Sequence, residues 1–204
     1  MDQTVLISAF FTLFVVIDPI GLAPMFLALT KGMQSRERRA VALRAVAIAG
    51  AILTLFALFG EAVLGFMGIS MPAFRIAGGV LLFLTALDML FERRTKRRQG
   101  QAHSDNDPSV FPLATPLIAG PGAMATMILL TGSAEGDWAL MAAMLAVMAT
   151  VLAVVLVAFF VGASVEKFLG DTGINVITRL LGMLLAALAV QFVLDGLSEM
   201  LRAL

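Results

Sequence analysis

The sequence predicts an all-α, polytopic membrane protein of six transmembrane helices, built as two inverted three-helix repeats whose first and fourth helices are broken. Three observations predict this fold class. The chain is 60% hydrophobic and 14% charged, with a mean hydropathy of +0.99, outside the range of soluble domains. Six apolar segments are long enough to cross a bilayer. Proline and glycine interrupt the first segment of each half at corresponding places.

The spans follow from length. A membrane helix needs about 20 mostly apolar residues, because each residue rises ~1.5 Å across a hydrocarbon core ~30 Å thick. The segments that qualify are 4–30, 40–60, 72–91, 110–131, 138–162 and 176–197. They predict a first repeat over 1–91, a polar linker over 92–109 and a second repeat over 110–204. Because each repeat has an odd number of spans, three, the second repeat is expected to be inverted in the membrane relative to the first.

Basic residues mark alternate connections. They are Lys31, Arg36, Arg38 and Arg39 in the first connection and Arg93, Arg94, Lys96, Arg97 and Arg98 in the third. The second connection carries Glu61 and the fourth Glu135 and Asp137, with no basic residue in either. Since cytoplasmic loops are enriched in Lys and Arg, the sequence predicts a cytoplasmic linker and both termini outside. The basic linker is interpreted as a topology anchor that contacts anionic lipid, not nucleic acid.

The two halves resemble each other in sequence. The stretch "VIDPIGLAPMFLALT" aligns with "LIAGPGAMATMILLT", and "FRIAGGVLLFLTALDML" aligns with "ITRLLGMLLAALAVQFVLDGL". The matched pairs are Gly21 and Gly122, Thr30 and Thr131, Arg75 and Arg179, and Gly78 and Gly182. Inverted repeats with discontinuous helices are common in secondary transporters.

The interruptions predict a polar site at mid-depth. Proline removes a backbone donor, and unsatisfied backbone is tolerated inside a bilayer only where protein or a water-filled cavity surrounds it. We therefore expect the two breaks to line one polar cavity. The predicted substrate-binding residues are Asp18, Pro19, Gly21, Gly120, Pro121 and Gly122, with Thr85 and Gln191 as further polar groups.

Asp18 has two open interpretations. A carboxylate at mid-depth costs ~2.5 kcal/mol or more unless it is paired, hydrated or protonated, which suits a proton or cation carrier. Asp before Pro is equally typical of an N-cap, here for a half-helix that starts at Pro19.

Charged residues at the ends of the third and sixth helices suggest gates. An Arg at a helix start and an Asp at a helix end both oppose the macrodipole, so each needs a partner. The helices are expected to run antiparallel, which predicts two ion pairs across the repeats: Arg75 with Asp195 at the outer mouth and Arg179 with Asp88 at the inner mouth. The alternative is that all four side chains reach the interface separately.

Other function classes find no support in the sequence. There is no cysteine, and no zinc-protease, Walker or dinucleotide-binding motif. We expect no enzyme activity, no metal site and no cofactor apart from a coupling H⁺ or Na⁺. The expected partners are membrane lipid and a small-molecule substrate, and a homo-oligomer is compatible with the sequence.

The motifs "VVIDPIGLAPMFLALT", "FRIAGGVLLFLTALDML" and "FPLATPLIAGPGA" resemble the MarC family of six-helix membrane proteins over nearly the whole chain. The resemblance implies a group named for neutral amino acid transporters (NAAT) and the cytoplasmic (inner) membrane of a prokaryote. The family positions that match are Asp18, Pro19, Gly21, Arg75, Gly120, Pro121 and Gly122.

Together these observations predict a secondary transporter of small neutral solutes, such as alanine or glycine, coupled to H⁺ or Na⁺. Two alternatives stay open. A translocase of lipids or lipid precursors would use Arg75 and Arg179 to bind phosphate. A non-transporting scaffold would bind a partner through the basic linker.

Overall fold

The computed structural model describes residues 3–91, 107–132 and 137–202, and every regular element in these ranges is helical. The elements are α1 (Gln3–Ile17), α2 (Pro19–Leu29), α3 (Ser35–Phe66), α4 (Met71–Leu90), η1 (Ser109–Ile118), α6 (Pro121–Gly132) and α7 (Trp138–Arg202). Gly170, with φ 62°, turns α7 back on itself, so α7 holds two spans, Trp138–Ala163 and Thr172–Arg202. The predicted all-α membrane protein is confirmed.

In the described ranges, five helices are long and apolar enough to cross a membrane, and a bent helix pair makes a sixth candidate span, in agreement with the six predicted segments. α1 and α2 together form the first, Gln3–Leu29, and η1 with α6 forms the fourth, bent by 55° at its break. The largest difference from prediction is α3, which exceeds 40–60 at both ends. Its extra residues include Arg36, Glu37, Arg38 and Arg39 at the start and Glu61 near the end, and charged residues lower hydropathy without opposing helix formation. Of the predicted linker 92–109, only the last three residues lie within the described ranges; its basic run and Glu135 lie outside them.

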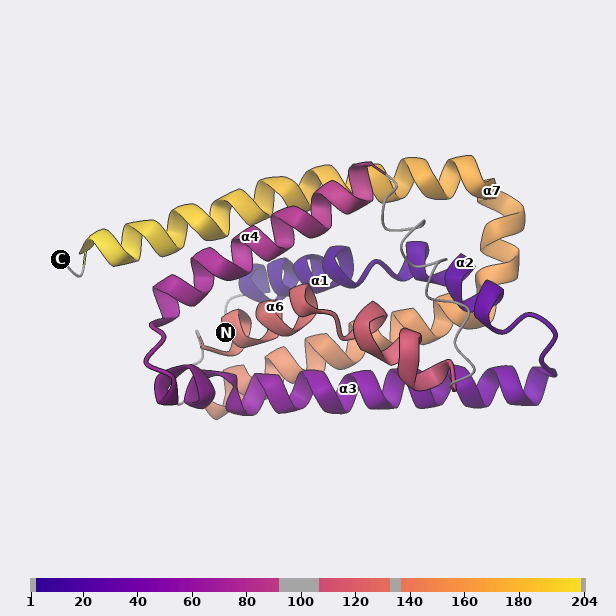
Figure 1. The fold of residues 1–204 in the computed structure, drawn as a ribbon, viewed down its shortest axis with the longest axis horizontal. Coiled ribbons are helices and arrows are strands. Elements are labelled where there is room, and N and C mark those ends of the chain that lie inside the picture. Colours follow the sequence, from indigo (N-terminus) through magenta and orange to yellow (C-terminus); the bar gives the residue numbers. More distant parts are fainter. Residues whose placement is uncertain (1–2, 92–106, 133–136, 203–204) are drawn as a thin grey trace.

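The spans run between two ends of the molecule (Figure 1). The α2–α3 connection lies at one end, which carries Lys31, Arg36, Arg38 and Arg39 and is called the basic end here. α4 runs toward this end, and η1 starts on the same side of the molecule. The two termini lie toward the opposite, or terminal, end. α1 and α2 run toward the basic end, whereas η1 and α6 run away from it. This arrangement is compatible with an inverted repeat.

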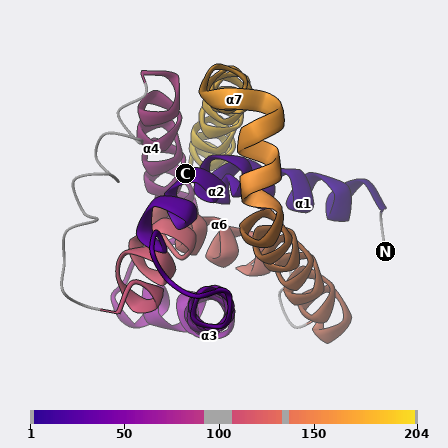
Figure 2. The ribbon, with the colours of Figure 1, turned by 90° about the vertical axis from the view of Figure 1, so that its right-hand side faces the viewer.

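The two halves interlock. α2 packs on the first span of α7, where the rings of Phe26 and Phe159 stack with centroids 4.3 Å apart. α3 packs on η1 and α6, so closely that a Cβ on Gly60 would lie 2.4 Å from Ile128 Cγ1. Figure 2, viewed from the basic end, shows α2 next to α7, with α3 below α6. Each interrupted span therefore depends on a long helix of the other half.

α4 and the second span of α7 form an antiparallel pair with duplicated contacts. A Cβ on Gly79 would lie 2.7 Å from the Ala189 carbonyl oxygen, and one on Gly182 would lie 3.3 Å from the Ala86 carbonyl oxygen. Both pairs, Gly79 with Gly182 and Ala86 with Ala189, are 103 residues apart. The contacts therefore make Gly79 the equivalent of Gly182, whereas the sequence comparison paired Gly182 with the neighbouring residue Gly78.

Large apolar side chains are exposed around the spans, as a bilayer requires. They include Phe11, Leu55, Phe59, Leu180 and Leu184. Exposed aromatic rings also lie at the span ends: Phe66 and Trp138 toward the terminal end, and Phe91 and Phe168 toward the basic end. Aromatic side chains at both ends of the spans are typical of membrane–water interfaces.

We predict that Gly79→Ala destabilises the protein by about 1–3 kcal/mol, because the added methyl meets backbone that has no room to move. The measurement is thermal unfolding in detergent, followed by the loss of helical circular dichroism. Gly65→Ala is the control, since a Cβ on Gly65 meets nothing within 4 Å, and its effect should stay within about 0.5 kcal/mol. Equal stabilities of the two variants would contradict the close α4–α7 packing.

Candidate functional site

The first break is a single residue. Asp18 adopts a left-handed conformation (φ 57°, ψ 66°) between α1 and α2, and Pro19 begins the new helix. The Gly21 backbone N–H donates to Asp18 Oδ1 at 3.0 Å. Asp18 is fully buried. The N-cap interpretation is therefore confirmed, and the carrier role stays a prediction that is compatible with it.

Gly21 is required by the Asp18 carboxylate. A Cβ on Gly21 would lie 2.1 Å from Asp18 Oδ2, far inside van der Waals contact. A side chain at this position would therefore push the carboxylate off the end of α2. The predicted trio of Asp18, Pro19 and Gly21 is one local structure in which the proline starts the helix, the aspartate caps it and the glycine leaves space.

The second break is longer and lacks an acidic side chain. Backbone in η1 is extended at Phe111 and Thr115, and the Ala119 N–H donates to the Ala114 carbonyl at 2.9 Å. Gly120 precedes Pro121, the first residue of α6, as Asp18 precedes Pro19 at the start of α2, although the sequence alignment pairs Asp18 with Ala119. A Cβ there would lie 2.6 Å from the Pro116 carbonyl oxygen. Where the first break supplies its own carboxylate, the second has only backbone.

The two interrupted spans meet at Gly122. A Cβ on this residue would lie 3.4 Å from Val16 Cγ1 of α1 and 3.5 Å from Thr85 Oγ1 of α4. The predicted site residues Gly122 and Thr85 are thus brought together. The residue of the first span that contacts them, Val16, precedes Asp18 by two positions. Thr85 donates its hydroxyl to the Leu81 carbonyl at 2.9 Å. A polar cavity at this point stays a prediction.

The two breaks differ in exposure. Asp18 and Pro19 are buried, whereas Pro121 and the nearby Pro116 are exposed and Gly120 is half-buried. The residues of the second break are therefore more exposed at the protein surface than those of the first.

The polar groups near the terminal end pair differently from the prediction. Arg75 of α4 forms an ion pair with Glu199, one helical turn beyond the predicted partner Asp195. Asp195 instead accepts a hydrogen bond from Gln191 Nε2 at 2.7 Å. Gln191 is exposed on α7 and belongs to this cluster. The sequence held a signal for Glu199, because residues four apart share a helix face.

The residues of the predicted inner pair lie on adjacent helices. A Cβ on Gly182 would lie 2.9 Å from Met89 Cβ, so the end of α4 packs against the start of the second span of α7. Asp88 and Arg179 are close in sequence to this contact, at the end of α4 that points toward the basic end. Their mutual ion pair stays a prediction.

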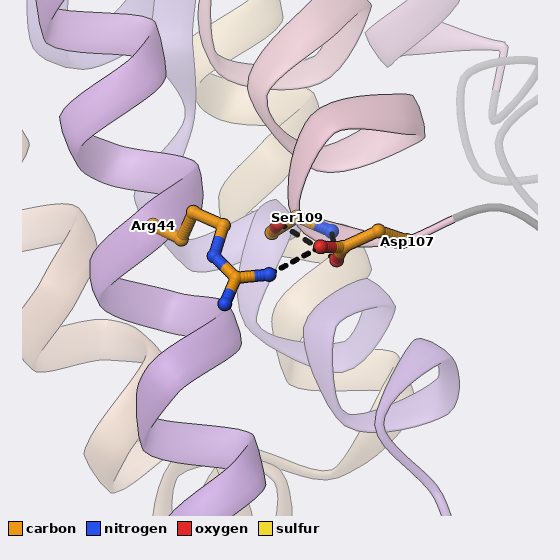
Figure 3. A network of polar contacts seen from close by, with 3 residues as sticks. All are labelled: Arg44, Asp107 and Ser109. Carbon is orange, nitrogen blue, oxygen red and sulfur yellow. Dashed lines mark hydrogen bonds and ion pairs between the residues drawn. The ribbon is translucent and has the colours of Figure 1, made fainter.

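A polar contact that the sequence did not suggest fixes the start of η1 (Figure 3). Asp107 accepts hydrogen bonds from the Ser109 hydroxyl at 2.7 Å and the Ser109 N–H at 3.0 Å, and it forms an ion pair with Arg44 of α3. The hydrogen bonds from Ser109, with a further contribution from Arg44, hold the pKa of Asp107 below its ordinary value, although burial acts in the opposite direction. Asp107 therefore stays ionised at neutral pH and joins η1 to α3.

We predict that Gly21→Ala lowers the free energy of unfolding by about 1 kcal/mol or more, because the methyl group displaces the Asp18 cap. Thermal unfolding in detergent measures this. Gly65→Ala again serves as the control, and a Gly21→Ala protein as stable as that control would contradict the cap.

Comparison with known proteins agrees with the fold. The model of the MarC family, described as integral membrane proteins, matches residues 3–201. A UPF0056 membrane protein of Aquifex aeolicus is 38% identical over 205 residues, which is 96% of this chain and 94% of the relative. One of Methanocaldococcus jannaschii is 38% identical over 203 residues, covering 97% and 98%.

The UPF0056 inner membrane protein YhgN of Escherichia coli is 32% identical over 192 residues, covering 94% of this chain and 95% of the relative. No solved structure matches the chain. Because the family match runs from α1 to the last turn of α7, the chain belongs to the MarC family of integral membrane proteins.

Proposed function

We propose that the protein is a secondary transporter of small neutral solutes, with neutral amino acids such as alanine or glycine as its substrate class and H⁺ or Na⁺ as the coupling ion. The observation that carries the proposal is the meeting of two interrupted spans at Gly122, where Val16 from the first span lies in contact. Paired discontinuous helices from oppositely oriented halves are the usual binding site of such transporters.

The difference between the two breaks supports a zwitterionic substrate. A helix N-terminus attracts a carboxylate. At α2 this place is taken by Asp18, whereas Gly120, which directly precedes Pro121 at the start of α6, has no side chain. In the proposed complex, the substrate carboxylate occupies the start of α6 as Asp18 occupies the start of α2. The Asp18 carboxylate nearby favours the substrate ammonium group or the coupling cation.

The interlocked packing suggests how the site opens. α2 is joined to the first span of α7 through Phe26 and Phe159, and α6 is joined to α3 through Ile128 and Gly60. In this proposal the two groups rotate against each other about the α4–α7 pair, which exposes the Gly122 region to each side of the membrane in turn. The basic end faces the cytoplasm, following the distribution of Lys and Arg.

The proposal predicts uptake of labelled alanine or glycine into proteoliposomes, increased by a proton or sodium gradient. Propionate and alaninamide each lack one charged group of alanine and should compete poorly. Protein that keeps its helical thermal transition but takes up no amino acid of a neutral panel under either gradient would overturn the assignment. Scrambling of a labelled phospholipid in the same vesicles tests the translocase alternative.

Asp18→Asn separates the two roles of this residue. Asparagine is also a good N-cap and tolerates a positive φ, so the fold should persist. We expect uptake driven by the substrate gradient alone to remain and the stimulation by the ion gradient to fall at least tenfold. Unchanged stimulation would leave Asp18 with the capping role only.

The ion pair near the terminal end predicts a charge-swap result. Arg75→Glu and Glu199→Arg should each reduce uptake, and the double variant should recover it if this contact closes the outer mouth. The matched control combines Arg75→Glu with Asp195→Arg, which should stay inactive because Asp195 is not the partner of Arg75. Recovery in the control alone would restore Asp195 as the partner.

A further inference from the structure

Four basic residues at the basic end form one patch, defined as Lys31, Arg36, Arg38 and Arg39. Lys31, Arg36 and Arg39 are exposed, and Arg38 is half-buried. The acidic residue among them, Glu37, accepts the Gln34 N–H at 3.0 Å and so belongs to the start of α3. Within the described ranges, the patch residues form no ion pair. The patch therefore carries a concentrated positive charge.

This charge is unfavourable for the protein alone. Three of the cations lie in the first two turns of α3, where the positive end of the helix dipole repels them, and the cations also repel one another. In the described part of the chain, Arg38 Nε is buried without a hydrogen-bond partner. Arg44, nearly two helical turns further along α3, differs in having Asp107 as a partner. An external anion would relieve the repulsion from the helix dipole and the repulsion among the cations.

The depth of the patch identifies the anion. α3 has 32 residues and is ~48 Å long at ~1.5 Å per residue, well above the ~30 Å of hydrocarbon. Residues 45–60 carry no charge and lie in the hydrocarbon, which places Arg44 near its edge. Arg39 and Arg36 then lie ~8–12 Å further out, at the level of the phospholipid phosphates and just beyond. Phosphate is the anion that is dense at this depth.

We propose that the patch binds the phosphate groups of anionic phospholipids in the leaflet at the basic end and that this binding stabilises the protein. Guanidinium groups bind phosphate through two parallel hydrogen bonds, and basic residues near an anionic membrane surface are attracted to it. The patch follows directly on α2, whose other end carries Asp18, so bound lipid anchors the half-helix of the first break. This inference does not depend on the proposed transport activity.

The test measures the thermal unfolding temperature in nanodiscs of phosphatidylcholine with increasing phosphatidylglycerol. The unchanged chain should unfold several degrees higher when phosphatidylglycerol is present, and the combined variant Arg36→Gln and Arg39→Gln should lose most of this increase. Arg202→Gln is the matched control, because Arg202 is exposed at the opposite end of the spans. Equal losses in the control and the double variant would overturn a specific patch.

Two further arms complete the test. Inorganic phosphate, added to phosphatidylcholine nanodiscs at matched ionic strength, should raise the unfolding temperature much less than phosphatidylglycerol; an equal rise would identify free phosphate as the ligand and overturn the lipid proposal. Native mass spectrometry of Lys31→Gln, which changes a residue outside the helices, should show fewer retained phosphatidylglycerol molecules than the unchanged chain. Equal retention would also count against the patch.

Discussion

The need to satisfy backbone hydrogen bonds inside a bilayer governs this structure. Two of the six spans break their helices in the membrane, at Asp18 and around Gly120, where a missing bond costs several kcal/mol. At Asp18 a side-chain carboxylate replaces the missing acceptor, and at the fourth span the Ala119 N–H reaches the Ala114 carbonyl across a wider turn. The surrounding helices then shield from lipid the backbone polar groups at the breaks that make no local hydrogen bond.

That covering explains why the two halves interlock. The half-helices α2 and α6 are short, so neither is stable in isolation and both need a long neighbour. Each neighbour comes from the other half, and close approach is possible because Gly60 and Gly162 have no side chain at the contact. In lipid the hydrophobic effect does not favour helix association, so such small-residue contacts and dispersion supply the stability. The breaks and the interlocking are one feature of the fold.

The sequence predicted what local pattern determines. Hydropathy placed the six spans, and the Asp18–Pro19 pair correctly indicated a cap. The sequence pattern could not predict side-chain pairings between helices, because these depend on how each helix is rotated about its axis. Whether Arg75 meets Asp195 or Glu199 is a matter of one turn on α7, and both residues fit the same pattern. The contact of Arg44 with Asp107 joins residues 63 positions apart, and no local signal connects them.

The unequal breaks also bear on the choice among substrates. Two identical breaks would offer two positive helix ends and would suit a substrate with two negative groups. Here a fixed carboxylate, Asp18, is buried at the first break, two residues from the point where the spans meet, while the start of α6 carries no acid. An ionised Asp18 would repel a lipid phosphate bound there, because charges interact most strongly in a low dielectric. In the complex proposed above, a zwitterion would place its ammonium near Asp18 and its carboxylate at the start of α6, and the asymmetry of the breaks supports that proposal over an anionic lipid.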